Sequence, residues 1–192
     1  MSERTTRSGF PVAAVVLTGI VALYMALVAF GNLTDFGTNR EFVRHVLAMD
    51  TTFRDDDLMW RAVTSRSLQD GAYIAIIVWE TLSAALLAIG AVWWALRLRR
   101  ESPGRARTVA VAGLVMVLVL FGAGFLAVGG EWFAMWQSKQ WNGLDAATRN
   151  FTVAGLALLV VQGAGRRETP ATPADRPLPT ADRDLSPERA ED

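Results

Sequence analysis

An uninterrupted apolar stretch, Ala72 to Leu96, constrains the fold of this chain more than any other feature. Its 25 residues include one ionisable side chain, Glu80, and no proline. As an α-helix with a rise of about 1.5 Å per residue, it would reach roughly 37 Å, which exceeds the roughly 30 Å hydrocarbon core of a bilayer. We therefore expect this stretch to cross a membrane.

Three further apolar stretches resemble the first in length, and together they predict four membrane spans at about residues 10–30, 72–96, 109–128 and 144–165. The side chains of this 192-residue chain are 52% hydrophobic, which leaves room for several spans but not for a separate soluble domain. The stretch nearest the N-terminus, residues 10–30, is longer than the apolar region of a secretory signal peptide, so we expect it to remain uncleaved. The predicted fold class is an all-α membrane protein, with one four-helix transmembrane bundle over residues 10–165.

The distribution of charge predicts the sides of the membrane on which the loops lie. The connection Arg97–Arg107 holds five arginines and one acidic residue, and short loops this rich in positive charge are retained in the cytoplasm. The N-terminus, residues 1–9, and the tail, residues 166–192, are then both cytoplasmic. The tail is rich in Pro, Ala, Thr, Arg and Asp, so we expect it to be disordered. Every basic residue except Lys139 is arginine, a bias typical of GC-rich coding, and we expect a bacterial inner membrane.

The connection between the first two spans, residues 31–71, is predicted to be an extracytoplasmic loop with helical structure of its own. Four apolar residues recur at helical spacing and share one face: Phe42, Val43, Val46 and Leu47. We expect an amphipathic helix that lies on the bilayer surface, followed by a weaker helical segment that begins near Asp56.

Composition excludes several classes of function. The formal net charge is zero, so the chain lacks the field that recruits nucleic acid. It contains no cysteine, which rules out disulfides and thiolate metal sites, and its single histidine, His45, is too few for the two axial ligands of a membrane haem. We expect no cofactor, no metal and no nucleic-acid partner. The expected partners are the lipid bilayer and either another membrane protein or a second copy of the chain.

Glu80 is the strongest functional signal in the sequence. It lies eight residues into its span, where an ionisable side chain usually faces the bundle interior and has a partner. Arg149, five residues into the fourth span from the same side, is the best-placed cation. We expect an outer-leaflet polar cluster of four residues: Glu80, Arg149, Asn150 and Glu131. The alternative is that Glu80 only fixes the register of its helix.

The single histidine allows two interpretations. Glu41 and His45 are one helical turn apart, so they can form an ordinary surface pair. His45 and Asp50 also spell H-x-x-x-x-D, a spacing that glycerolipid acyltransferases use to activate a hydroxyl, although the other sequence blocks of those enzymes are missing. Small residues, Ala84 and Ala88 in the second span and Gly122 with Gly124 in the third, indicate close helix packing.

Several peptides resemble, in their order along the chain, a bacterial family of predicted small integral membrane proteins of unknown function. They are NLTDFGTN (32–39), FVRHVLAMDTTF (42–53), MWRA (59–62), WE (79–80) and MWQSKQWNG (135–143). The resemblance covers about residues 10–165 and implies four spans with an extended outer loop. It implies no activity, cofactor or catalytic residue.

These peptides and the charge pattern together predict one surface on the outer face. Its candidate residues are Asp35, His45, Asp50, Trp60, Trp136, Gln137, Trp141 and Asn142. Tryptophan at such positions is typical of the headgroup level of a membrane and also of protein interfaces.

Three functions are open on the sequence alone. The first is an accessory, assembly or interaction subunit of a membrane complex, which docks through the outer loop and the Trp-rich edge. The second is a small transporter or proton-linked carrier that uses Glu80 and Arg149. The third is a membrane enzyme acting on lipid or quinone, with His45 as an acid or base. The first fits the sequence best, because no internal repeat or paired broken helix indicates a transporter.

Overall fold

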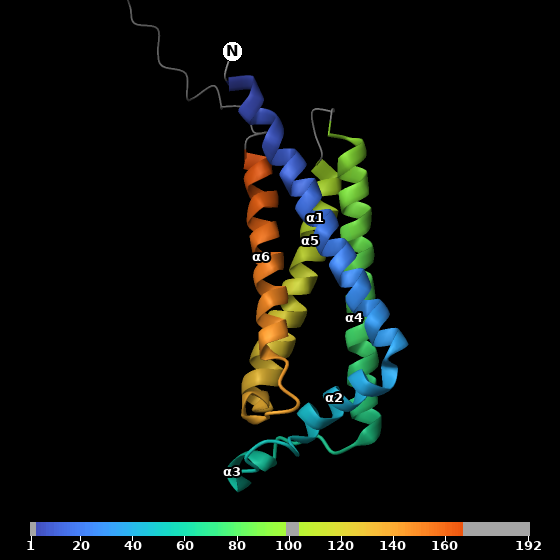
Figure 1. Cartoon of the computed structure of the whole chain (residues 1–192), viewed down its shortest axis with the longest axis vertical. Coiled ribbons are helices and arrows are strands. Elements are labelled where there is room, and N and C mark those ends of the chain that lie inside the picture. Colours follow the sequence, from blue (N-terminus) through green and yellow to red (C-terminus); the bar gives the residue numbers. More distant parts are fainter. Residues whose placement is uncertain (1–2, 99–103, 167–192) are drawn as a thin grey trace, which may run out of the picture.

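The computed structural model describes residues 3–98 and 104–166 as an all-helical chain (Figure 1). Its elements are α1 (Glu3–Thr34), α2 (Phe36–Ala48), α3 (Asp56–Met59), α4 (Arg66–Leu96), α5 (Gly104–Leu118), the π-helix η1 (Val119–Trp132), the 3-10 helix η2 (Met135–Gln137) and α6 (Leu144–Arg166). The expected disordered tail, 166–192, lies outside the described residues except for Arg166.

Four helical segments are long and apolar enough to cross a membrane: Phe10–Thr34, Arg66–Leu96, Gly104–Trp132 and Leu144–Ala164. The third of these consists of α5 and η1 in direct continuation. The predicted fold class, a four-helix membrane bundle, is confirmed, and the chain is a multi-pass integral membrane protein.

The four spans form a ring in which α1 packs on α4 and α6, and α5 packs on the same two helices (Figure 1). Glycine allows the closest approach between α4 and α5. A Cβ atom on Gly90 would lie 2.8 Å from the backbone nitrogen of Ala110, and one on Gly113 would lie 2.7 Å from Leu87 Cγ. The expected packing residues were only partly right, since Ala84 is buried but Ala88 is exposed.

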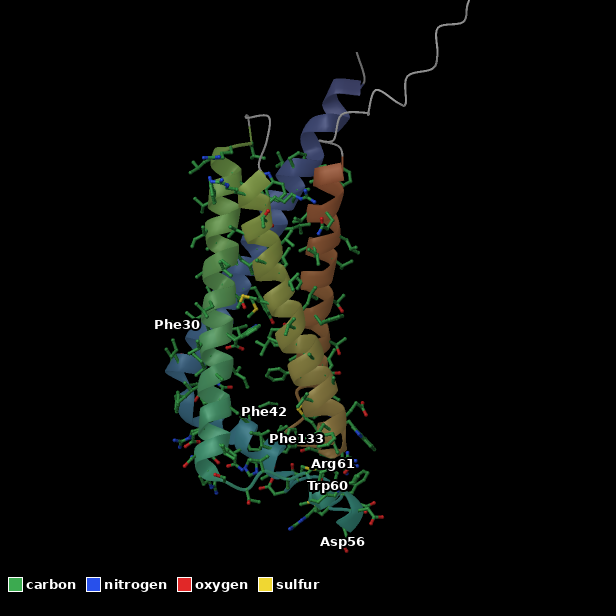
Figure 2. The ribbon with its side chains drawn as sticks, turned by 180° about the vertical axis from the view of Figure 1, so that it is seen from behind. Phe30, Phe42, Asp56, Trp60, Arg61 and Phe133 are labelled. Atoms are coloured by element: carbon green, nitrogen blue, oxygen red, sulfur yellow. The ribbon has the colours of Figure 1, made fainter. Side chains whose placement is uncertain are left out.

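The bundle opens at the end where α2, α3 and η2 lie, which we call the α2 end (Figures 1 and 2). α4 packs along α5 but diverges from η1, which continues the span of α5 toward the α2 end. With 31 residues and a rise of about 1.5 Å each, α4 is roughly 47 Å long, so it projects beyond a bilayer core of roughly 30 Å. α2 packs on the N-terminal half of α4, where it contacts Asp70, Tyr73 and Ile77.

The first span is longer than its apolar stretch predicted. Gly31-Asn32 suggested the end of the helix, but α1 continues to Thr34, and Thr34 Oγ1 donates to Phe30 O at 2.9 Å. The reason is a tertiary contact: the side chain of Asn32 donates a hydrogen bond to Glu80 of α4, which holds this last turn in the helix.

The predicted loop helix is present as α2, but it does not simply lie on the bilayer surface. Val43 is buried against Tyr73 and Ile77 of α4, so its apolar face is covered by protein. The guanidinium of Arg44 donates two hydrogen bonds to Asp70 of α4, at 2.8 and 3.0 Å. Packing and this ion pair hold α2 across the end of the bundle, where it closes the space between α4 and η1.

Candidate functional site

Two adjacent cavities lie at the α2 end, where α4 and η1 diverge. We call them the apolar cavity and the polar cavity, and each has a volume of about 300 Å³. They share four lining residues, Phe42, Val43, Ile76 and Phe125, and therefore adjoin one another at these side chains. Together they provide a polar compartment next to an apolar one.

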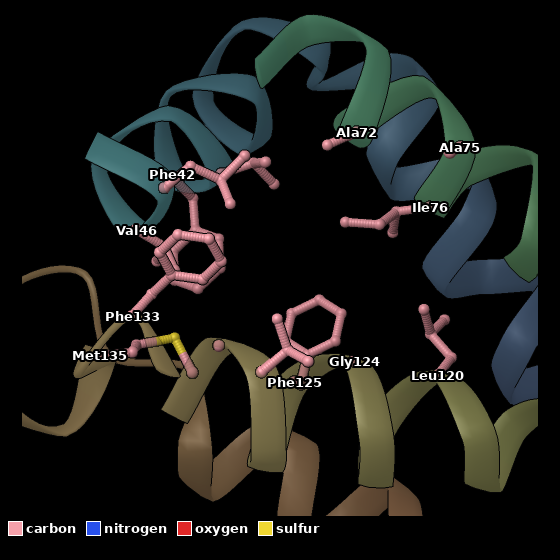
Figure 3. Close-up of a pocket in the computed structure, with 14 residues that line it drawn as sticks. Phe42, Val46, Ala72, Ala75, Ile76, Leu120, Gly124, Phe125, Phe133 and Met135 are labelled. Atoms are coloured by element: carbon pink, nitrogen blue, oxygen red, sulfur yellow. The ribbon is translucent and has the colours of Figure 1, made fainter. Parts of the chain in front are cut away.

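The apolar cavity lies between α2, α4 and η1 (Figure 3). Its lining comes from α2 (Phe42, Val43, Val46, Leu47), from α4 (Ala72, Ala75, Ile76) and from η1 and the segment after it (Leu120, Gly124, Phe125, Val128, Gly129, Phe133, Met135). The four α2 residues are those of the predicted apolar face. Because no lining side chain is charged or a strong hydrogen-bonding group, the cavity suits hydrocarbon.

The polar cavity contains Glu80, which is only 2% exposed. Asn32 Nδ2 at the end of α1 donates a 2.6 Å hydrogen bond to Glu80 Oε2. The backbone carbonyl of Asn32 in turn accepts a hydrogen bond of 2.7 Å from the hydroxyl of Tyr73. Glu80 is therefore paired with an amide from α1 rather than with the expected cation.

The α6 wall of the polar cavity carries Arg149 and Asn150. Asn150 is 6% exposed, and its Oδ1 accepts a 2.7 Å hydrogen bond from the hydroxyl of Tyr24 on α1. Arg149 is exposed in the isolated chain and forms no ion pair or hydrogen bond with any residue that the structure describes. The fourth residue of the predicted cluster, Glu131, is exposed near the end of η1 and does not line the polar cavity.

Sequence reasoning missed the α1 side of the polar cavity. Tyr24 lies inside the predicted first span, 10–30, and Asn32 lies two residues beyond its predicted end, and neither was among the predicted site residues. The available signal was that each has a polar side chain near the end of an apolar stretch. Only the packing of α1 against α4 and α6 shows that these side chains point into the bundle.

His45 lines neither the apolar nor the polar cavity. Its Nδ1 is 2.9 Å from both carboxylate oxygens of Asp50, and its ring stacks on Trp141 with centroids 4.7 Å apart. The expected pair with Glu41 does not form, because Glu41 instead accepts from Arg44. His45 and Asp50 line a separate polar cavity of about 220 Å³. The histidine is thus not part of the Glu80 site.

Four exposed aromatic residues and one arginine form what we call the aromatic ledge, at the α3 edge of the α2 end (Figure 2). They are Phe53, Trp60, Trp132, Trp136 and Arg61. The Arg61 guanidinium lies 5.5 Å from the Trp60 ring centroid and 4.9 Å from that of Trp132. Phe53 meets Trp136 edge to face at 5.9 Å. The ledge therefore joins the loop after α2 to the end of the third span.

The remaining residues of the predicted outer surface stabilise the loops of this end. Gln137 Oε1 accepts from the backbone nitrogen of Phe53 at 2.9 Å, and Asn142 Oδ1 accepts from that of Leu144 at the start of α6, at 3.1 Å. Asp35 is exposed and precedes α2 without a capping hydrogen bond from its side chain. All eight predicted surface residues lie at the α2 end, but they form several separate contacts rather than one cluster.

Arg44 of α2 lies outside the spans and forms ion pairs with two acidic residues, Asp70 and Glu41. Its two hydrogen bonds to Asp70, followed by the one to Glu41, hold the pKa of the guanidinium above its ordinary value, while partial burial acts in the opposite direction. Arg44 therefore stays charged and keeps α2 attached to α4. Among the described residues there is no group of three or more acidic or histidine side chains that could hold a metal ion.

A family model described as "Predicted small integral membrane protein (DUF2165)" matches residues 11–163. No curated protein and no solved structure matches the chain. The matched segment includes every residue that lines the apolar and polar cavities.

Proposed function

We propose that this chain, which belongs to the family of predicted small integral membrane proteins, is an accessory protein that binds an amphiphilic molecule of the membrane in its paired cavities. The observation that carries the proposal is the contact between a polar and an apolar cavity through four shared residues. An amphiphile has the same two-part character. Its polar head would occupy the polar cavity and part of its hydrocarbon the apolar one.

The size and lining of the cavities support this assignment. Ligand sites in proteins are mostly apolar and contain a few placed polar groups, with volumes that start near roughly 300 Å³. The apolar cavity presents hydrocarbon and aromatic side chains, and the polar cavity presents the paired Glu80 and Asn32 together with Asn150. A water-soluble ligand would gain nothing from the apolar part.

The route of entry also favours a ligand from the bilayer. Ala75 of α4 and Gly124 of η1 line the apolar cavity from facing helices, yet both are exposed in the isolated chain. Both helices belong to membrane spans, so hydrocarbon can enter between them without passing through water.

Filling the apolar cavity tests the proposal. We expect the protein purified in mild detergent to retain a membrane amphiphile that mass spectrometry of the extract detects. The Ala75→Phe variant should lose most of it, because the added ring occupies the cavity. Ala95→Phe is the matched control, since Ala95 is also an exposed alanine of α4 but does not line the cavity. Absence of a retained amphiphile in the unaltered protein, or equal retention by Ala75→Phe, would overturn the proposal.

A second candidate function, docking of another membrane protein, is favoured by the aromatic ledge. Aromatic residues and arginine are enriched at the centre of protein interfaces, and here Arg61 is held between two exposed tryptophans. If the ledge binds a partner subunit, the stoichiometric complex isolated in mild detergent should be lost with Trp60→Ala. It should persist with Trp93→Ala, which removes a tryptophan that contacts a different arginine, Arg97, at the opposite end. Equal behaviour of the two variants would reject this function.

A further inference from the structure

We propose that the head group bound in the polar cavity is anionic, a phosphate or carboxylate, and that Arg149 and Asn150 recognise it. This inference rests on the amphiphile-binding function proposed above and specifies the class of ligand. It follows from the hydrogen-bonding capacity that the protein leaves unused on the α6 wall of the cavity.

Arg149 is a cation without a counter-ion. It lies five residues into α6, roughly 8 Å from the start of a membrane span, where an unpaired charge is costly. Asp145, one helical turn earlier, and Glu80, across the cavity, both fail to form an ion pair with it in the part of the chain described. A guanidinium in such a position binds phosphate or carboxylate with two parallel hydrogen bonds.

Asn150 supplies a second donor beside Arg149. Its Oδ1 is taken by the Tyr24 hydroxyl at 2.7 Å, which leaves the amide nitrogen as the free end of the side chain. Within the described ranges, 3–98 and 104–166, that nitrogen makes no hydrogen bond. The Tyr24 contact fixes the side chain, so the cavity presents an oriented N–H donor next to a guanidinium.

Glu80 faces the cavity from the side opposite this wall. It lies on α4, which is diagonally opposite α6 in the ring of helices, and its Oε2 accepts the hydrogen bond of Asn32. The donors on α6 and the acid on α4 therefore face the cavity from opposite sides. This arrangement suits a head group whose anionic oxygens lie against α6.

The alternative is that Arg149 reaches past the cavity to the head groups of bulk lipid. The two arrangements differ in selectivity. If the guanidinium contacts only bulk lipid, the cavity binds amphiphiles regardless of their charge. If the guanidinium binds the head group in the cavity, the cavity prefers anionic amphiphiles.

Native mass spectrometry with probe lipids of identical acyl chains separates these cases. The probes are phosphatidylglycerol, which is anionic, phosphatidylcholine, which is zwitterionic, and diacylglycerol, which lacks a phosphate. We expect the unaltered protein to retain phosphatidylglycerol about tenfold more than diacylglycerol, a difference of about 1.4 kcal/mol, and to retain phosphatidylcholine, which also carries a phosphate, to an intermediate extent. Arg149→Gln should abolish this preference, and Arg149→Lys should keep part of it. Arg105→Gln, an exposed arginine at the opposite end, is the control and should leave the preference unchanged.

The outcomes distinguish this inference from the function on which it rests. If all three probes are retained equally and Ala75→Phe displaces them, amphiphile binding stands but anion recognition is wrong. If no probe is retained, the proposed function itself fails. Competition by inorganic phosphate at millimolar concentration shows whether the site binds lipid phosphate or free phosphate. Displacement of the lipid would show a site for free phosphate and overturn the lipid assignment.

Discussion

The side-chain amide of Asn32, near the end of α1, donates a 2.6 Å hydrogen bond to Glu80 in the middle of α4. The two residues are 48 positions apart in the sequence, and their contact joins the two helices at the level of the polar cavity. Glu80, a buried acid in a membrane span, therefore has a neutral partner. Asn32 fixes the position of its carboxyl group, so a role of Glu80 in helix packing or in ligand binding depends on Asn32.

Removal of that partner should destabilise the protein. We predict that Asn32→Ala lowers the free energy of unfolding in detergent by about 1–3 kcal/mol, because it leaves a buried carboxyl without its hydrogen bond. Glu80→Gln should cost less, since its amide oxygen still accepts from Asn32. Thr34→Ala is the control, because that hydroxyl bonds only within α1 and is exposed. The measurement is denaturant titration of the purified protein, and an Asn32→Ala variant as stable as the unaltered chain contradicts the prediction.

The contact between α4 and α5 should not tolerate a side chain at Gly90. We predict that Gly90→Ala lowers the thermal stability by an amount that corresponds to about 1–3 kcal/mol, because the new Cβ would lie 2.8 Å from a backbone atom of Ala110. Gly19→Ala on α1 has nothing within 4 Å of the added carbon, and it should be neutral or slightly stabilising. Thermal unfolding followed by size-exclusion chromatography compares the two. Equal stabilities would mean that α4 and α5 are not packed this closely.

The ion pair between Arg44 and Asp70 should control the mobility of α2. We expect Arg44→Ala to make amide hydrogens in residues 36–48 exchange several-fold faster, because two hydrogen bonds from α2 to α4 are lost. Arg54→Ala, in the exposed loop before α3, should leave their exchange unchanged. Hydrogen-exchange mass spectrometry reports both. The double variant Arg44→Ala/Asp70→Ala should resemble Arg44→Ala alone, and additive effects would indicate that the two residues act separately.

The two ends of the bundle should face opposite sides of the membrane. The sequence contains no cysteine, so a single introduced thiol reports its own location. We predict that Arg54→Cys reacts with a membrane-impermeant maleimide in intact spheroplasts, and that Arg105→Cys reacts only after permeabilisation, because short loops rich in arginine are as a rule retained in the cytoplasm. Labelling of Arg105→Cys alone would invert the topology, and labelling of both in intact spheroplasts would contradict a fixed orientation.

The sequence was sufficient for the parts of the fold that depend on local properties. Whether a segment such as Ala72–Leu96 leaves water for a bilayer depends on the summed transfer free energy of consecutive residues, which can be read along the chain. The apolar face of α2, with Phe42 and Val46, follows in the same way from helical period.

Only the tertiary structure decided which side chains meet. Depth in the membrane and charge, both read from the sequence, suggested Arg149 as the partner of Glu80. The packing of α1 instead brings Asn32 to that position. Likewise Tyr24 reaches Asn150 across 126 residues, and α4 diverges from η1 to leave room for the two cavities. Depth in the membrane is a property of each helix alone, but rotation, crossing and divergence depend on interlocking side chains from different helices. The polar and apolar compartments exist only after that packing is complete.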